Sequence, residues 1–371
     1  MTGRTGKWLR VASVTATVAL AAAGCSSGGG TSTTTAASLP KYGPAEKTTL
    51  NVGVVPAMDS AGFFVAMNEG LFAREGLTIN YTPETSSETA ISSQESGQLD
   101  ISGGNYVSYI DAAALHAAPL EIVAEGSVMT KGAQVIYTPG NSDIKTLAQL
   151  RGKTIAVNAP DNIDFLLDEI VLSGYGIKVN NASGYSSSEV NFPADPIAFP
   201  TMAGEVAKGG SPYAAATLPE PFASLAEQNN GMVPLVDLDQ GAASQFPVEG
   251  YVVTKQWAEK NPNTLDRFLA ALEEGQEIAD TNRTAVEQAF ENIKASPGSK
   301  LPAAAFGQVP ASIAAVMALN TYPIGIDETR IQRVADVMAQ FNLLPKRFNV
   351  SSMILPSSQF SFTPFEGGSA S

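Results

Sequence analysis

The sequence predicts an α/β protein made of two lobes, each with a mainly parallel sheet flanked by helices. In Thr49–Ala124, short β-rich segments alternate three times with helical segments, and the loops between them are short. This alternation is typical of parallel strands joined by crossover helices. Gln134–Leu218 repeats the pattern. The chain also has 371 residues, 44% of them hydrophobic, and because one core rarely grows that large, two domains are expected.

The first residues have the pattern of an export signal. Arg4, Lys7 and Arg10 precede the apolar run Val11–Ala23. That run is shorter than the roughly 20 residues that a membrane-spanning helix needs, and it suits a secretory signal peptide. We therefore expect residues 1–24 to be a signal peptide that is removed.

The single cysteine follows directly after this run. Ala22-Ala23-Gly24-Cys25 resembles a bacterial lipobox, although its first position is Ala, where Leu is commoner. We expect cleavage before Cys25 and lipidation of its thiol. The alternative is a soluble secreted chain with an incidental cysteine. Residues 25–48 include the Ser/Gly/Thr-rich segment Ser26–Ser38 and are expected to form a flexible tether.

Hydrophobic periodicity sets the elements expected in the first block. Phe64, Met67 and Leu71 recur at helical spacing and mark a buried face. The aromatic residues of this segment favour a core over a binding site. The expected strands are Thr49–Val55, Leu77–Tyr81, Leu99–Ser102 and Leu120–Ala124, and the expected helices are Ala61–Ala73, Ser86–Ser96 and Tyr106–Ala117.

The second block contains the clearest amphipathic helix of the chain. It begins at Ile163 and repeats apolar residues at the spacing of one helical face. The other elements expected in this block are strands at Gln134–Thr138, Lys153–Val157, Glu189–Phe192 and Ala214–Leu218, and helices at Thr146–Leu150 and Ile197–Lys208.

The remaining chain is expected to return to the first lobe. Met232–Leu238 and Gly250–Thr254 are apolar and β-rich, and they are the candidates for the return crossing. Helices are expected at Thr264–Asp280, Thr284–Lys294, Pro310–Ala318 and Asp327–Phe341. The predicted division is lobe one at 49–128 and 237–356, lobe two at 129–236, and a loosely held tail at 357–371.

Composition excludes several kinds of chemistry. The net charge of −14 disfavours nucleic acid as a partner, because binding phosphates takes clusters of Lys and Arg. One cysteine cannot form an internal disulfide, and a Cys/His metal site or a Ser-His-Asp triad would depend on His116 alone. His116 lies in an Ala-rich segment and is expected to be structural. We predict no metal, no cofactor and no catalytic residue.

Four ordered motifs resemble those of a known family. Ala66-Met67-Asn68-Glu69-Gly70-Leu71-Phe72, followed by Glu75-Gly76-Leu77, resembles its A-x-x-x-G-x-F-x-x-x-G-L segment. Ser96-Gly97-Gln98-Leu99-Asp100-Ile101, Leu150–Val157 and Leu218-Pro219-Glu220-Pro221-Phe222 resemble three further segments. Together they are similar to the NMT1/THI5-like and SsuA-like solute-binding proteins of ABC importers, over Leu50–Phe222. Each motif is weak alone, and the order and spacing give the set its specificity.

The resemblance implies a type II periplasmic-binding-protein fold, in which two lobes joined by two hinge crossings close over a small-molecule solute. It implies a monomer on the outer face of the cell membrane, held through its N-terminal lipid, that delivers solute to an ABC permease and ATPase. Bound molecules in this group include nitrate, sulfonates, taurine and thiamine-precursor pyrimidines. The alternatives are an enzyme on the same fold, of the pyrimidine-precursor synthase or dehydratase type, and a structural lipoprotein.

Four loops are expected to meet between the lobes, because open α/β sheets bind ligands beyond the carboxyl ends of their strands. Ser86, Ser87 and Asp161 could instead only cap helices, Gly104 could serve backbone geometry alone, Tyr106 could fill space, and Glu220 could join the lobes. The predicted ligand-binding residues are Met58, Asp59, Ser60, Thr85, Ser86, Ser87, Gly104, Asn105, Tyr106, Asn158, Asp161, Asn162 and Glu220.

The charges near these loops bear on the ligand. Asp59, Glu88, Asp161 and Glu220 lie in or beside them, whereas Lys131 lies just outside. Acidic groups without Arg disfavour an anion held by ion pairing, although helix N-termini could still hold one anionic group. The hypothesis is a small polar organic solute with an amine, such as a pyrimidine precursor, and nitrate or a sulfonate is the alternative.

Overall fold

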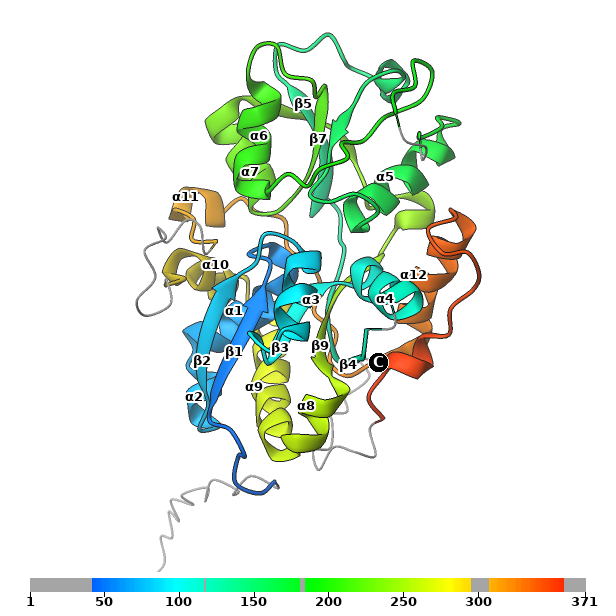
Figure 1. Cartoon of the computed structure of the whole chain (residues 1–371). Helices are drawn as coiled ribbons and strands as arrows, with labels where there is room; N and C mark the ends of the chain where they lie inside the picture. The colour runs from blue at the N-terminus through cyan, green and yellow to red at the C-terminus, as the bar shows by residue number, and fades with distance from the viewer. Residues whose placement is uncertain (1–41, 117, 181–183, 295–306, 357–371) are drawn as a thin grey trace, which may run out of the picture. The chain divides into compact units, whose positions relative to one another are not determined.

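The computed structural model describes residues 42–116, 118–180, 184–294 and 307–356 (Figure 1). The predicted signal peptide, the lipidation site at Cys25, most of the tether and the tail therefore lie outside the described residues. The described residues all belong to one compact unit, Lys41–Ser371. Within the described residues, no helix combines the length and apolar character needed to cross a membrane.

The described end of the predicted tether is held against the body. Gly43 N donates to Asn263 Oδ1 over 2.7 Å, and Lys47 Nζ lies 2.6 Å from Asp100 Oδ2. The tether prediction is therefore wrong for residues 42–48. Small and polar composition does not show where a chain begins to pair with residues far away in the sequence.

The first sheet has the strand order β2-β1-β3-β9-β4. Strand β1 pairs in parallel with β2 and with β3, and β9 runs antiparallel between β3 and β4. The strands are β1 Thr49–Val54, β2 Thr78–Pro83, β3 Ile101–Asn105, β4 Leu120–Val128 and β9 Pro247–Thr254.

The second sheet has the order β6-β7-β5-β8. Here β6 and β7 are parallel, and β5 runs antiparallel to both of its neighbours. The strands are β5 Gln134–Pro139, β6 Ile155–Ala156, β7 Ala215–Pro219 and β8 Met232–Asp237. The predicted fold class, two mainly parallel sheets with flanking helices, is confirmed, with one opposing strand in each sheet among the described residues.

Two strand assignments are corrected. Met232–Leu238 and Gly250–Thr254 are not the return crossing, because the first forms edge strand β8 and the second lies inside β9. The chain passes between them, through residues 238–246. Glu189–Phe192 makes only isolated bridges, from Val190 and Asn191. A run of apolar β-formers looks the same in a sheet and in a connection, so composition could not separate these cases.

The helices follow the predicted positions with three main differences. The single helix predicted over Ala61–Ala73 is broken at Gly70, whose φ of 69° ends the first helix. Neither α7 nor α8 was predicted. The helices are α1 Ala61–Asn68, α2 Leu71–Arg74, α3 Ser87–Glu95, α4 Tyr106–His116, α5 Ile163–Gly174, α6 Phe199–Ala207, α7 Phe222–Asn230, α8 Lys255–Lys260, α9 Pro262–Thr281, α10 Arg283–Asn292, α11 Ala311–Ala314 and α12 Glu328–Gln340, and short 3-10 turns are η1 Met58–Ser60, η2 Leu147–Leu150, η3 Gly241–Ala243 and η5 Val350–Met353.

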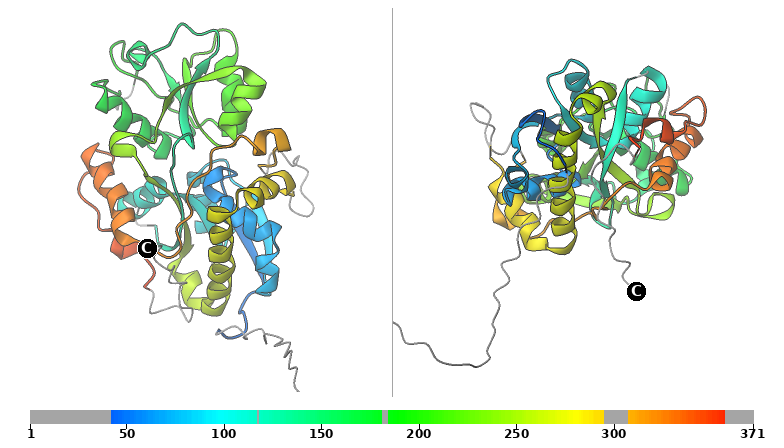
Figure 2. Two further views of the ribbon diagram at one scale, coloured as in Figure 1. Left: turned by 180° about the vertical axis from the view of Figure 1, so that it is seen from behind. Right: turned by 90° about the horizontal axis from the view of Figure 1, so that it is seen from below.

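Long helix α9 covers the first sheet on the face seen from behind (Figure 2). Helices α1 and α9 pack closely against each other at two glycines. A Cβ added to Gly275 would lie only 2.4 Å from the carbonyl oxygen of Gly62. Phe72 stacks on Phe268 with ring centroids 5.2 Å apart, and Phe64 belongs to the same buried cluster. The aromatic residues of Ala61–Ala73 are therefore core, and each stabilises the fold by roughly 2 kcal/mol through burial.

Candidate functional site

Loops from the two sheets touch each other directly. The Asn158 side chain, after β6, donates from Nδ2 to the Thr85 carbonyl, after β2, over 2.9 Å. Met58 N, after β1, donates to the Glu220 carbonyl, after β7, over 2.7 Å. Each contact joins a predicted loop of the first sheet to a predicted loop of the second, so the structure brings these four predicted residues together in two pairs.

Asp59 lies at the centre of a polar cluster on the first-sheet side. Its Oδ1 accepts from Asn320 Nδ2 over 2.7 Å and from Ser127 Oγ over 3.3 Å. Next to it, Ser60 Oγ donates to Glu249 Oε1 over 2.6 Å. Burial raises the pKa of Asp59 to about 6. Burial and then the charge of Asp59 raise the pKa of Glu249 well above its ordinary value.

Asp164 supplies the corresponding carboxyl from the second-sheet side. Asn162 caps α5 by accepting from the backbone nitrogens of Asp164 and Phe165, which fixes Asp164 in the first turn. Its carboxyl accepts from Asn158 N over 3.1 Å and from Gln134 Nε2. Burial raises the pKa of Asp164 to about 7, and the charge of Asp59 adds to this. The two carboxyls therefore lie close enough to influence each other.

No Lys or Arg in the described part of the chain is among the groups that shift the pKa of Asp59, Glu249 or Asp164. Lys131, which lies just outside the predicted loops, is exposed. Three carboxyls thus meet near the paired loops without a basic partner. Among the described residues, no group of three or more His, Cys, Asp or Glu side chains is arranged to hold a metal ion.

The polar groups around the start of α3 form hydrogen bonds with one another. Ser86 Oγ accepts from Thr89 N over 3.3 Å and caps α3. Ser87 Oγ accepts from both Asn105 N and Asn105 Nδ2, each over 2.9 Å. Asn105 Oδ1 in turn accepts from Ser108 N over 2.9 Å. The capping alternative therefore accounts for Ser86, and the hydroxyl of Ser87 is engaged within the first lobe.

Gly104 and Tyr106 fit their structural alternatives. A Cβ on Gly104 would lie 2.5 Å from Ser87 Oγ, so only glycine lets α3 approach β3 here. Tyr106 is fully buried. Its ring packs so closely on Gly250 that a Cβ added there would lie 2.5 Å from Tyr106 Cε1. The structure places this ring against β9.

The structure also shows the surroundings of Asp161 and Glu220. Asp161 is exposed, with a φ of 53°, and Asn162 rather than Asp161 caps α5. The Glu220 carboxylate accepts from Ser224 Oγ over 2.9 Å and from Ala318 N over 3.2 Å. Together with its carbonyl bond to Met58, this makes Glu220 a joining residue, the second of its two predicted roles.

Several residues of this polar cluster were not predicted from the sequence. Glu249 had one signal, since it is a lone acid within the apolar strand Pro247–Thr254. Asp164 had a weaker one, since it is an acid in the first turn of the helix predicted to begin at Ile163. Asn320 and Ser127 had none, because only the tertiary fold brings them to Asp59. His116, expected to be structural, ends α4 with Nε2 3.4 Å from Asp111 Oδ2.

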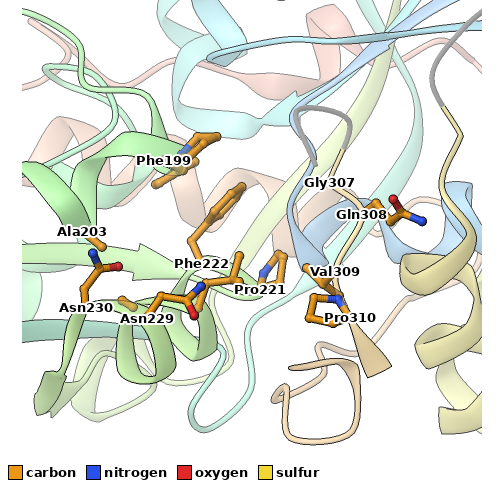
Figure 3. A pocket seen from close by; sticks show the side chains of 13 residues that line it. Phe199, Ala203, Pro221, Phe222, Asn229, Asn230, Gly307, Gln308, Val309 and Pro310 are labelled. Atoms are coloured by element: carbon orange, nitrogen blue, oxygen red, sulfur yellow. The ribbon is translucent and has the colours of Figure 1, made fainter. Parts of the chain in front are cut away.

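A separate cavity of about 250 Å³ lies between α6, α7 and Gly307–Pro310 (Figure 3). Phe199 and Phe222 stack there with centroids 5.3 Å apart. Of the described residues that line it, none carries a charged side chain. None of the thirteen predicted binding residues lines it either, so it is distinct from the polar cluster.

Comparison with known proteins identifies the family. Residues 57–283 match the model of the family described as NMT1/THI5 like. A search of curated proteins found no match. Among solved structures, the alkanesulfonate-binding protein SsuA from Xanthomonas axonopodis pv. citri, bound to MOPS, is 18% identical with a TM-score of 0.63, and the match covers 84% of this chain and 99% of that one.

Two further structures are similar in fold. The periplasmic nitrate-binding protein NrtA from Synechocystis PCC 6803 is 16% identical with a TM-score of 0.64, covering 86% of this chain and 92% of that one. The desulfurization enzyme DSZB is 15% identical with a TM-score of 0.57, covering 84% and 98%. These identities establish the fold alone. Because the family model matches more than half of the chain, the protein belongs to the NMT1/THI5-like family.

Proposed function

We propose that this protein is an extracytoplasmic solute-binding lipoprotein, which captures a small polar organic molecule between two lobes and delivers it to an ABC importer. The observation that carries the proposal is the pairing of loops from the two sheets, Thr85 with Asn158 and Met58 with Glu220. Such loops lie beyond the carboxyl ends of strands, where open α/β sheets bind ligands. Family membership supports the same role.

The proposed mechanism is closure of the two lobes over the solute. Residues 49–128 and 237–356 form one lobe and residues 129–236 the other. A solute that contacts loops of both lobes stabilises the closed arrangement relative to the open one. An ABC permease, the proposed partner, then distinguishes the loaded monomer from the empty one by its closed shape.

The acidic side chains of the polar cluster favour a neutral or cationic solute. Asp59, Glu249 and Asp164 meet there without a basic partner among the described residues. An anion such as nitrate or a sulfonate would add negative charge next to these carboxyls, and it would lack the arginine that usually binds such groups. The solutes named for SsuA and NrtA are therefore the alternative for this chain.

Lipid anchoring at Cys25 would hold the protein beside its transporter on the outer face of the membrane. The support is the lipobox-like Ala22-Ala23-Gly24-Cys25 after an apolar run. In cells producing the full chain, Cys25→Ser should move the protein from the membrane fraction to the medium or periplasm. Unchanged membrane association of that variant would refute the anchor.

A thermal-unfolding screen of the chain without its signal peptide tests the solute-binding function. A bound solute stabilises the folded state by RT ln(1 + [L]/Kd), or about 2.7 kcal/mol at one hundred times Kd. The screen should contain nitrate, alkanesulfonates, taurine, amines and aminopyrimidines. Stabilisation by at least one class supports the proposal, and no response to any class contradicts it.

The similarity to DSZB keeps an enzyme as the second candidate, because that neighbour shares the fold. The two functions differ in what happens to the solute. A binding protein returns its solute unchanged after denaturation, whereas an enzyme converts it. Mass spectrometry of a stabilising solute after prolonged incubation distinguishes the two.

A further inference from the structure

The carboxyl of Asp59 is placed to receive a ligand group. The flanking residues Met58 and Ser60 are buried, whereas Asp59 keeps part of its surface accessible. Its Oδ1 already accepts two hydrogen bonds, from Asn320 and Ser127. A carboxylate has four acceptor positions, so Asp59 retains capacity for further donors.

A second acceptor beside Asp59 has no partner. Asn320 is 6% exposed, and its Oδ1 is buried without a hydrogen bond. The Nδ2 of the same amide is bonded to Asp59 Oδ1 over 2.7 Å. Because the amide group is small and planar, Asn320 Oδ1 is held beside the Asp59 carboxylate. A buried acceptor left open is costly, and a ligand N–H would satisfy it.

Further acidic side chains lie around this pair of acceptors. Glu249 interacts electrostatically with Asp59 from the first sheet, and Asp164 does so from α5. Glu88 Oε2, whose charge also acts on Asp164, is a further buried acceptor without a partner. Open acceptors beside the Asp59 carboxylate call for a group that donates hydrogen bonds, and a positive charge on that group pairs with ionised Asp59.

We infer that Asp59 and Asn320 form the anchor for a basic nitrogen of the solute, a protonated amine or amidine. This inference rests on the proposed solute-binding function and adds the chemical group that is recognised. The basic nitrogen donates to Asp59 and to Asn320 Oδ1, and the remainder of the solute lies between the paired loops.

The test is titration calorimetry of the chain without its signal peptide against two sets of probes. The cationic set is cadaverine and agmatine, and the anionic set is nitrate, methanesulfonate and isethionate. We expect binding from the cationic set and none from the anionic set. For the tightest cationic probe, Asp59→Asn should weaken binding roughly 10- to 100-fold, the value of a charged hydrogen bond.

Matched variants keep the test independent of folding. Asp143→Asn makes the same chemical change at an exposed position away from the cluster and should leave the affinity unchanged. Asn320→Leu removes the open acceptor while keeping the side-chain size, and it should also weaken the cationic probe. If Asp59→Asn does not fold, Asn320→Leu decides the question, because unchanged affinity in that variant overturns the anchor.

The outcomes separate this inference from the function on which it rests. Binding of the anionic set alone, or cationic binding that Asp59→Asn leaves intact, overturns the anchor and keeps the solute-binding function. The absence of binding by both sets overturns the anchor. If the wider thermal screen also shows no response, the solute-binding function fails with it.

Discussion

Replacing Asp164 with Asn should change how the stability of this protein depends on pH. Burial raises the pKa of Asp164 to about 7 from the 3.8 of a free aspartate. The folded chain therefore holds this proton more tightly than the unfolded chain does, and stability is lost as the pH rises from about 4 through about 7. For these two pKa values the loss between pH 5 and pH 8 is on the order of 2–3 kcal/mol.

Asp164→Asn removes that loss because the amide does not ionise. The variant keeps one acceptor oxygen for its two donors, Asn158 N and Gln134 Nε2, so at pH 5 it should be less stable than the parent by roughly 1–2 kcal/mol. At pH 8 the difference should narrow or reverse. At about 2 °C per kcal/mol for a protein of this size, the gap in Tm should move by roughly 5 °C.

Scanning calorimetry of the two proteins at pH 5, 6, 7 and 8 measures this gap. Asp143→Asn, at an exposed position, is the control and should show a nearly constant difference from the parent. A gap between Asp164→Asn and the parent that stays constant across this range would refute the reasoning, because it would mean that Asp164 ionises as a free aspartate does.

Three further substitutions test particular contacts. Gly250→Ala should cost roughly 1–3 kcal/mol in chemical denaturation, because its Cβ would lie 2.5 Å from the buried Tyr106 ring; an unchanged midpoint would show that the ring can move. Glu220→Ala should cost about 3 kcal/mol by leaving donors such as the buried Ser224 N unpaired. Glu220→Gln should recover part of this loss, and equal losses in the two variants would contradict the hydrogen-bonding role. Phe268→Ala should lower stability by roughly 3–5 kcal/mol, and a loss below about 1 kcal/mol would show that the first core tolerates the cavity.

Local sequence patterns were sufficient to predict most of the fold. The alternation of strands and helices in Thr49–Ala124 and Gln134–Leu218 depends on residues close together in the chain, and most of the expected elements of both blocks form. The break at Gly70 was missed because a glycine inside a helical pattern is compatible with either continuation or a left-handed turn. Strand β9 was misplaced because its partners, β3 and β4, lie more than one hundred residues away.

The candidate site was predicted less completely than the fold. The sequence pattern was sufficient to locate the loops at the strand ends. Two pairs of their residues are in contact, Thr85 with Asn158 and Met58 with Glu220. Roles within the loops could not be assigned, since the same Ser or Asn serves to cap a helix or to bind a ligand. Asn320 comes from a distant part of the chain, and no local pattern marks an amide whose oxygen is left open only in the folded structure.

The central claim is that this chain captures a small organic solute with a basic nitrogen and releases it unchanged. Mass spectrometry of the protein purified under native conditions from the cells that produce it, before and after denaturation, tests this most directly. We predict one small molecule per chain, with a basic nitrogen, that is retained natively and recovered intact on unfolding. Recovery of nitrate or an alkanesulfonate, or of a converted product, would contradict the account.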